Sequence, residues 1–171
     1  MRVVADACGI GGSLLYRYYP SKLRLLEAVV DDVLEGLEEL NDALAQAAQR
    51  NGDIRARLLE LGTIYMRHVD AWDAWYTVWC MALPLDDSRR ARLVATQERV
   101  FATVADALRG NGWNDPYVAA RTLTGALFST VMYQNRTRFE TAGPQLRAAF
   151  LDELVALLLR SRLPAPTPIA R

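Results

Sequence analysis

Several features are scarce in this chain of 171 residues, and each scarcity narrows the kind of protein it can be. The chain has two cysteines, Cys8 and Cys80, and one histidine, His68. Two distant thiols and a lone imidazole supply neither a disulfide framework nor the four ligands of a structural zinc site. We therefore expect both cysteines to be buried thiols, and we expect no metal and no cofactor.

Long apolar runs are also missing. No apolar stretch reaches the ~20 residues that a membrane-spanning helix needs, because charges interrupt even residues 150–160. Residues 1–4 lack the apolar core and small-residue cleavage site of a secretory signal. The sequence predicts a soluble, cytoplasmic protein without membrane contact.

Neither sign of charge is in excess, since the formal net charge is zero. The whole molecule is therefore no obvious polyanion binder, and any nucleic-acid surface must be local. Residues 1–27 carry four basic side chains against two acidic ones, whereas residues 31–42 carry six acidic side chains. The alternative interpretation of that acidic run is an ordinary solvated helix face.

Strand patterns are almost absent, and the helix signals predict an all-α protein. Capping residues open each expected helix, and glycine or proline ends most of them. The expected starts are Ser21, Asp53, Asp86 or Asp87, Asp115 with Pro116, and Pro144. We predict a head and connector helix over residues 1–40, a helical body over 41–163, and a flexible proline-rich tail over 164–171.

Residues 4–22, VADACGIGGSLLYRYYPSK, have the pattern of a helix, a tight turn and a second helix. Ala5 and Cys8 are small enough for two helices to approach, and Gly9 suits a turn with positive φ. Leu15 is expected to face inward. The second helix then exposes small, hydroxyl-bearing and cationic residues, which suit base edges and phosphates.

This stretch resembles the TetR family of transcriptional regulators. The family pattern ends in Leu-Tyr-x-His/Tyr-Phe-x-Ser/Asn-Lys, and residues 15–22, LYRYYPSK, follow it almost residue by residue. The resemblance covers about two dozen residues. It implies a DNA-binding, ligand-responsive repressor that binds a palindromic operator as a homodimer. Position by position, it implies major-groove contacts for Gly12, Ser13 and Arg17, phosphate contacts for Tyr16, Tyr18 and Lys22, and a core position for Tyr19.

Three departures separate this chain from the family pattern. Gly11 stands where the family often has Ser or Thr, which weakens the helix cap by a few tenths of a kcal/mol. Tyr19 replaces the usual Phe. The first helix of the family head has no counterpart before Arg2, so Val4, Leu14 and Leu15 are expected to lack cover.

Two explanations for that missing helix remain open: a chain start assigned too late, or a protein that has lost DNA binding. The intact turn and helix chemistry favours the first. In either case we expect the 171 residues alone to bind double-stranded DNA poorly, with a partly disordered head.

The resemblance also implies a cavity in the body for a small, mostly apolar or aromatic effector. The alternative is that these aromatic residues are ordinary core. The residues expected to line the cavity are Tyr65, Met66, His68, Trp75, Trp79, Phe101, Phe128, Tyr133 and Gln134. An effector would favour a head spacing that no longer fits adjacent major grooves, with the helix after Ser21 transmitting the movement.

The last two expected helices combine small residues with an apolar side. This pattern, together with the resemblance, predicts a four-helix dimer interface. Its expected residues are Gly125, Ser129, Leu151, Leu154, Val155 and Leu158. The alternative is an internal core with no dimer.

Two other functions compete with a regulator. An enzyme would have to rely on His68, Asp70 and Asp73, and no nucleophile, phosphate-loop or metal motif accompanies them, so we expect no catalytic site. The second alternative is a helical ligand-binding or dimerisation module that no longer binds DNA.

Overall fold

The computed structural model describes all residues except 51, 72–83, 138–143 and 163–171. Every regular element in this described part is a helix, which confirms the all-α prediction. The helices are α1 (Arg2–Ala7), α2 (Gly12–Tyr18), α3 (Lys22–Ala48), α4 (Ile54–Ala71), α6 (Asp87–Leu108), α7 (Pro116–Thr137) and α8 (Pro144–Arg160). The predicted tail and the aromatic segment up to Leu83 lie outside the described residues.

The predicted capping residues begin the helices. The Ser21 hydroxyl accepts a hydrogen bond from the backbone N–H of Arg24, and Asp86 accepts one from that of Arg89. Asp53 and Asp115 cap α4 and α7 in the same way. Each of these side chains satisfies a backbone donor that the first helical turn leaves free, so the helix starts are local properties of the sequence.

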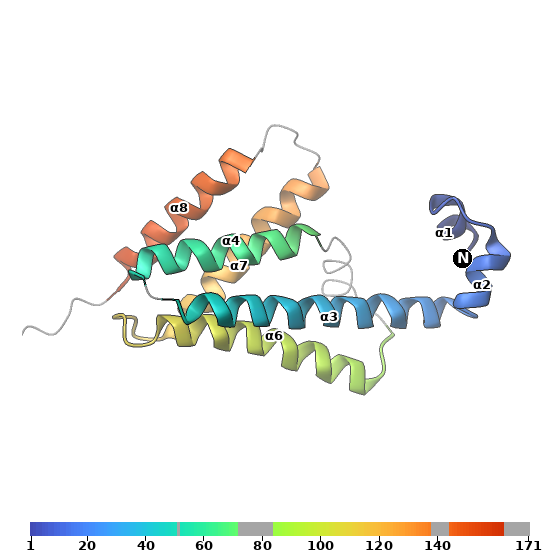
Figure 1. Ribbon diagram of the computed structural model, residues 1–171, viewed down its shortest axis with the longest axis horizontal. Coiled ribbons are helices and arrows are strands. Elements are labelled where there is room, and N and C mark those ends of the chain that lie inside the picture. The colour runs from blue at the N-terminus through green and yellow to red at the C-terminus, as the bar shows by residue number, and fades with distance from the viewer. Residues whose placement is uncertain (51, 72–83, 138–143, 163–171) are drawn as a thin grey trace, which may run out of the picture.

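The body is a bundle in which α3 runs along both α4 and α6, while α7 contacts α4, α6 and α8 (Figure 1). Its core is mostly leucine and valine, and the largest completely buried side chains include Leu34, Leu37, Leu40, Leu44, Leu58, Leu61, Leu108, Leu123 and Leu127. Gly62 allows α4 to approach α7 and α8 closely. A Cβ there would lie 2.4 Å from Leu151 Cδ1 and 3.3 Å from Leu127 Cδ1.

Helices α1 and α2 form a small head at one end of α3 (Figure 1). They pack on each other, and within the described part of the chain neither packs against a third helix. Ala5 and Leu15 are the buried residues between them. The position of the head therefore follows the direction of α3.

Cys8 is exposed, so the expectation that it is a buried thiol is wrong. It follows the last residue of α1, where its backbone N–H still donates to Val4, but its side chain is not enclosed between the two helices. Cys80 lies outside the described residues.

No helix in the described ranges has both the length and the apolar composition that crossing a bilayer requires.

Candidate nucleic-acid interface

The turn between α1 and α2 has the geometry that its sequence predicts. Gly9 has φ of +65°, a left-handed conformation that side chains with a Cβ rarely adopt. The backbone N–H of Ile10 then donates to Ala5 O at 3.0 Å, which closes the end of α1. Gly11 starts α2 without a side-chain cap, as expected for glycine at this position.

Helix α2 buries one side chain and exposes the others. Leu15 packs inward, while the residues expected at the DNA surface are exposed: Gly12, Ser13, Tyr16, Arg17 and Tyr18. A Cβ placed on Gly12 would meet no atom within 4 Å, so open space lies in front of the first helical residue. The start of α2 can therefore approach a flat surface closely.

Lys22 extends this surface onto the next helix. It is exposed at the first position of α3, directly after the Ser21 cap. The guanidinium of Arg17 lies 5.4 Å from the centre of the Tyr18 ring, so the cation and the phenol are held side by side. Tyr19, expected in the small core, is half-buried.

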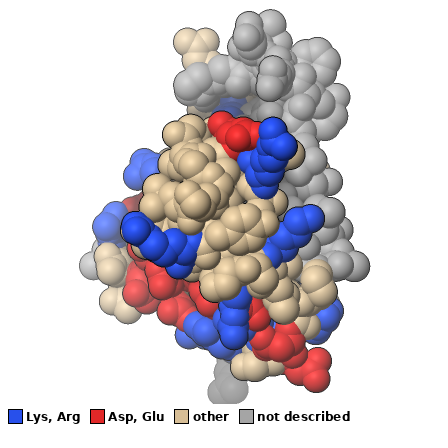
Figure 2. Space-filling model, turned by 90° about the vertical axis from the view of Figure 1, so that its right-hand side faces the viewer, with Lys and Arg blue, Asp and Glu red and all other residues tan. Residues whose placement is uncertain are grey.

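Some basic side chains of the head surface pair with acidic ones, and others do not. Arg24 pairs with Glu27 at 2.9 Å, whereas no ion pair joins Arg17 or Lys22 to an acidic side chain in the described structure. Figure 2 views this end of the molecule, and an uncharged surface occupies the centre with basic side chains around it. Acidic side chains gather mainly lower in that view. The end face thus offers cations that internal pairs do not neutralise.

An apolar surface accompanies these polar groups. Val3, Val4, Ile10 and Leu14 are all exposed. Val4 and Leu14 therefore lack cover as expected, but Leu15 does not, because α1 covers it. Helices α1 and α2 thus bury Leu15 between them and leave the other large apolar side chains of the head exposed.

The body residues expected to line an effector cavity are only partly together. Tyr65 and Met66 are buried on α4, and Phe128 on α7 packs against the same core. Burial raises the pKa of the Tyr65 hydroxyl, so it stays protonated and can donate a hydrogen bond. His68 is half-buried, with Nδ1 3.0 Å from Ile64 O. Trp75 and Trp79, and the side chains of Tyr133 and Gln134, lie outside the described residues.

Phe101 is half-buried on α6. Its ring is 6.2 Å from that of Tyr117 in an edge-to-face pair, and the Arg121 guanidinium lies 5.0 Å above it. Tyr117 also donates a hydrogen bond to Glu98, an exposed residue. This cluster joins α6 and α7, while the preceding residue, Val100, is completely buried. The place of Phe101 at an effector cavity stays a prediction.

The residues expected at a dimer interface divide into two groups. Gly125 and Ser129 are exposed. The other four are buried in the core of the single chain: Leu151, Leu154, Val155 and Leu158. Their place at a dimer interface stays a prediction. Helix α8 uses these side chains to pack on α4 and α7.

A groove of about 560 Å³ lies beside that packing, between α7 and α8. Leu154 and Leu158 form part of its lining, and the exposed side chains of Val118 and Leu157 stand along it. Trp113 belongs to the same groove, and its indole N–H donates to Leu158 O at 3.2 Å. Val118 and Leu157 thus add exposed apolar side chains to a groove that two of the expected residues, Leu154 and Leu158, also line.

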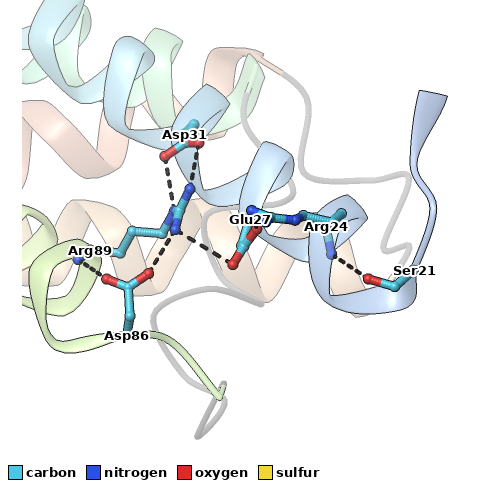
Figure 3. Close-up of polar contacts among 6 residues, drawn as sticks. All are labelled: Ser21, Arg24, Glu27, Asp31, Asp86 and Arg89. Atoms are coloured by element: carbon cyan, nitrogen blue, oxygen red, sulfur yellow. Dashed lines mark hydrogen bonds and ion pairs between the residues drawn. The ribbon is translucent and has the colours of Figure 1, made fainter.

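Arg89 is a residue that the sequence alone does not single out. Its Nε and Nη2 each lie 3.2 Å from a carboxylate oxygen of Asp31, and its Nη1 lies 2.6 Å from Asp86 and 3.6 Å from Glu27 (Figure 3). The hydrogen bonds that Arg89 donates to Asp31 and Asp86 raise the pKa of the guanidinium further above its already high value. Arg89 thus ties the N-terminus of α6 to α3. No local spacing pairs residues so far apart in the chain.

Gln97, a buried amide on α6, is a second residue that no sequence pattern singles out. Its Oε1 has no hydrogen-bond partner in the described part of the chain. An unpaired buried carbonyl oxygen destabilises the fold unless a water or a ligand donates to it.

The chain matches no protein-family model, and no curated protein matches it in sequence.

Proposed function

We propose that this chain is a transcriptional regulator of the TetR type, which binds DNA through α2 and the start of α3. The single observation that carries the proposal is the arrangement of α2. One leucine, Leu15, is buried, while the polar residues of α2 and the lysine that begins α3 are exposed: Ser13, Tyr16, Arg17, Tyr18 and Lys22. A helix that meets a DNA groove needs this combination of a rigid inner contact and an outer surface of small, hydroxyl and cationic groups.

Each group has a distinct role in this proposal. Gly12 and Ser13 stand at the N-terminal end of α2, where short side chains allow approach to base edges. Arg17 reaches toward the same groove. Tyr16, Tyr18 and Lys22 flank the helix and hold phosphates, which sets the register of the protein on the duplex without reading sequence.

A homodimer completes the proposal, because one short helix reads only half of a palindromic operator. The surface that supports it is the groove between α7 and α8. Val118 and Leu157 are 57% and 56% exposed, and the small residues Gly125 and Ser129 continue the α7 side. A second copy related by a two-fold axis would bury this apolar strip against itself.

The body is proposed to bind a small effector near Tyr65, Met66 and Phe128. To control DNA binding, the effector must bind more tightly to the conformation with one head spacing than to the conformation with the other. An effector with equal affinity for both would not shift their populations.

The test is a selection from a pool of random-sequence duplexes with the chain, followed by fluorescence anisotropy on the enriched duplex. We expect weak enrichment of an inverted repeat whose half-sites are spaced by about one helical turn, because the 171 residues alone are expected to bind DNA poorly. Lack of any enrichment, with anisotropy equal for enriched and scrambled duplexes, would contradict sequence-specific binding.

One observation favours a second candidate, a helical ligand-binding or dimerisation module that does not bind DNA. Val3, Val4, Ile10 and Leu14 leave the head with an apolar surface exposed to water. For this candidate the selection yields no enriched sequence, while the chain still forms a dimer.

A further inference from the structure

The most connected charged side chain in the described structure is Arg89, in the first turn of α6. Its guanidinium lies between carboxylates from two helices, with Asp31 on one side and its own helix cap, Asp86, on the other (Figure 3). Glu27 adds a third carboxylate at 3.6 Å. Two parallel N–H to oxygen bonds with Asp31 fix the relative orientation of the two groups as well as their distance.

These contacts lie where α3 leaves the body. Leu26 and Val29 are partly buried against the core and Val30 is completely buried, whereas Leu23 is exposed. Beyond that point α3 continues to the Ser21 cap and the head. Because α1 and α2 pack against no other described helix, α3 alone carries the head.

Glu27 extends the contact one turn toward the head. Its second oxygen, Oε2, accepts from Arg24 Nη1 at 2.9 Å, and Arg24 is the residue whose backbone N–H donates to Ser21 (Figure 3). A chain of hydrogen bonds and ion pairs thus runs from the N-cap of α6 to the N-cap of α3.

Other ion pairs between α3 and α6 are weaker by geometry and by exposure. Glu38 lies 3.7 Å from Arg99 and 4.0 Å from Arg92, and all three side chains are more than half exposed. Arg89 is 24% exposed, and its partners Glu27, Asp31 and Asp86 are 15%, 44% and 48% exposed, so water and salt screen these contacts somewhat less.

We propose that Arg89 is a positioning residue that sets the direction in which α3 leaves the body, through its bonds to Asp31 and Glu27. The consequence for DNA rests on the proposed function. From Asp31 to Lys22 is nine residues of helix, or about 13 Å, so a rotation of about 10° at Arg89 moves the start of α3 by about 2 Å. Two heads that must meet grooves one turn apart are sensitive to such a shift.

The same geometry makes Arg89 a point of control. Asp86 binds both the backbone N–H and the guanidinium of Arg89, so any displacement of the α6 N-terminus displaces the group that holds α3. Movement at the start of α6 is thereby converted into movement of the head.

The experiment measures the distance between two spin labels by pulsed electron paramagnetic resonance. The labels are attached at Leu23→Cys on α3 and Ala95→Cys on α6, both exposed positions, in a Cys8→Ser, Cys80→Ser background. Labelled chain is diluted with unlabelled cysteine-free chain, so only distances within one chain are recorded. The variant is Arg89→Met, which keeps the aliphatic stem, and the matched control is Arg92→Met on the same helix.

We expect a narrow distribution for the parent and for Arg92→Met, and a broader one with a mean shifted by about 2 Å for Arg89→Met. Arg89→Lys should lie between them, because an ammonium cannot bond Asp31 in two places. Sodium chloride at 1 M should broaden the parent distribution, since the Debye length falls to about 3 Å. Both variants are first checked for the helical circular dichroism of the parent.

Identical distributions for the parent and Arg89→Met would overturn the proposal, as would equal broadening in Arg89→Met and Arg92→Met. Should Arg89→Met not fold, Arg89→Lys and the salt dependence decide by the same criteria. The measurement uses neither DNA nor a dimer interface, so failure of the proposed function leaves its outcome unchanged.

Discussion

Gly62 on α4 and Leu151 on α8 lie so close that a Cβ on the glycine would be 2.4 Å from Leu151 Cδ1. Leu151 is buried, so its side chain has little space to move away. The close approach of these two helices is what turns the leucines of α8 toward the core of the chain.

Gly62→Ala is therefore expected to destabilise the protein although alanine favours helix. The overpacking costs about 1–3 kcal/mol, and the better helix propensity returns about 1 kcal/mol, so a net loss of about 1 kcal/mol is expected. Urea unfolding followed by circular dichroism measures it. Thr63→Ala is the control, since Thr63 is the next residue and is exposed; it should stay within about 0.5 kcal/mol of the parent. Equal or greater stability of Gly62→Ala would refute the close packing.

Val118→Glu combined with Leu157→Glu is expected to produce a monomer that keeps its fold. Both side chains are more than half exposed in the single chain, so the charges cost little within it, but they would face the second copy in the groove between α7 and α8. Sedimentation equilibrium measures the mass. Val94→Glu on α6 is the matched control, because Val94 is 51% exposed and stands away from that groove. A parent that is already monomeric, or a double variant that stays dimeric, would contradict the interface.

Gln97→Met is expected to stabilise the protein by about 1 kcal/mol, because it removes a buried oxygen without a partner and keeps the side-chain length. Thr124→Val is the comparison, since the buried Thr124 hydroxyl donates to Ala120 O at 2.9 Å. That variant gives up a hydrogen bond and should lose stability. Chemical unfolding measures the stability of both variants. A loss of stability in Gln97→Met would mean that Gln97 Oε1 accepts a hydrogen bond in the folded protein.

The free energy of unfolding is expected to depend on pH partly through the ionisation of Asp86. The backbone N–H of Arg89, followed by its side chain, holds the pKa of this carboxyl below its usual range. A lowered pKa stabilises the fold at pH values above that of the unfolded group, about 3.9, and this contribution is lost as pH falls through the folded pKa. Thermal melts of the parent and of Asp86→Asn should therefore differ at pH 6, begin to converge near pH 4 and coincide only below the lowered pKa of the folded state. A constant difference down to pH 2 would show that the charge plays no part.

Much of the fold was predictable because helix boundaries are local. Ser21, Asp86 and Asp115 each cap the helix that follows them, with partners three residues or fewer away. Such contacts depend only on neighbouring residues, so a sequence pattern is enough to place them.

The direction of each apolar side was not predictable in the same way. Periodicity places Leu151, Val155 and Leu158 on one side of α8, but the same pattern suits a partner chain or the core of the chain itself. The close approach at Gly62 places Leu151 against the core of the chain, and this contact joins residues far apart in the sequence. The contact between Arg89 and Asp31 could not be predicted from the sequence for the same reason, because it joins residues 58 positions apart.

The most direct test of the account compares Lys22→Ala and Ser13→Ala in DNA binding, by anisotropy titrations on the selected duplex and a scrambled one at several salt concentrations. Lys22, the only lysine of the chain, is proposed to hold a phosphate, so its loss should weaken binding to both duplexes alike and lower the salt slope by about 1. Ser13→Ala should change the preference between the duplexes and leave the salt slope unchanged. Identical effects of the two substitutions on both duplexes, or no effect of either, would contradict the assignment of α2 and the start of α3 as the DNA-binding surface.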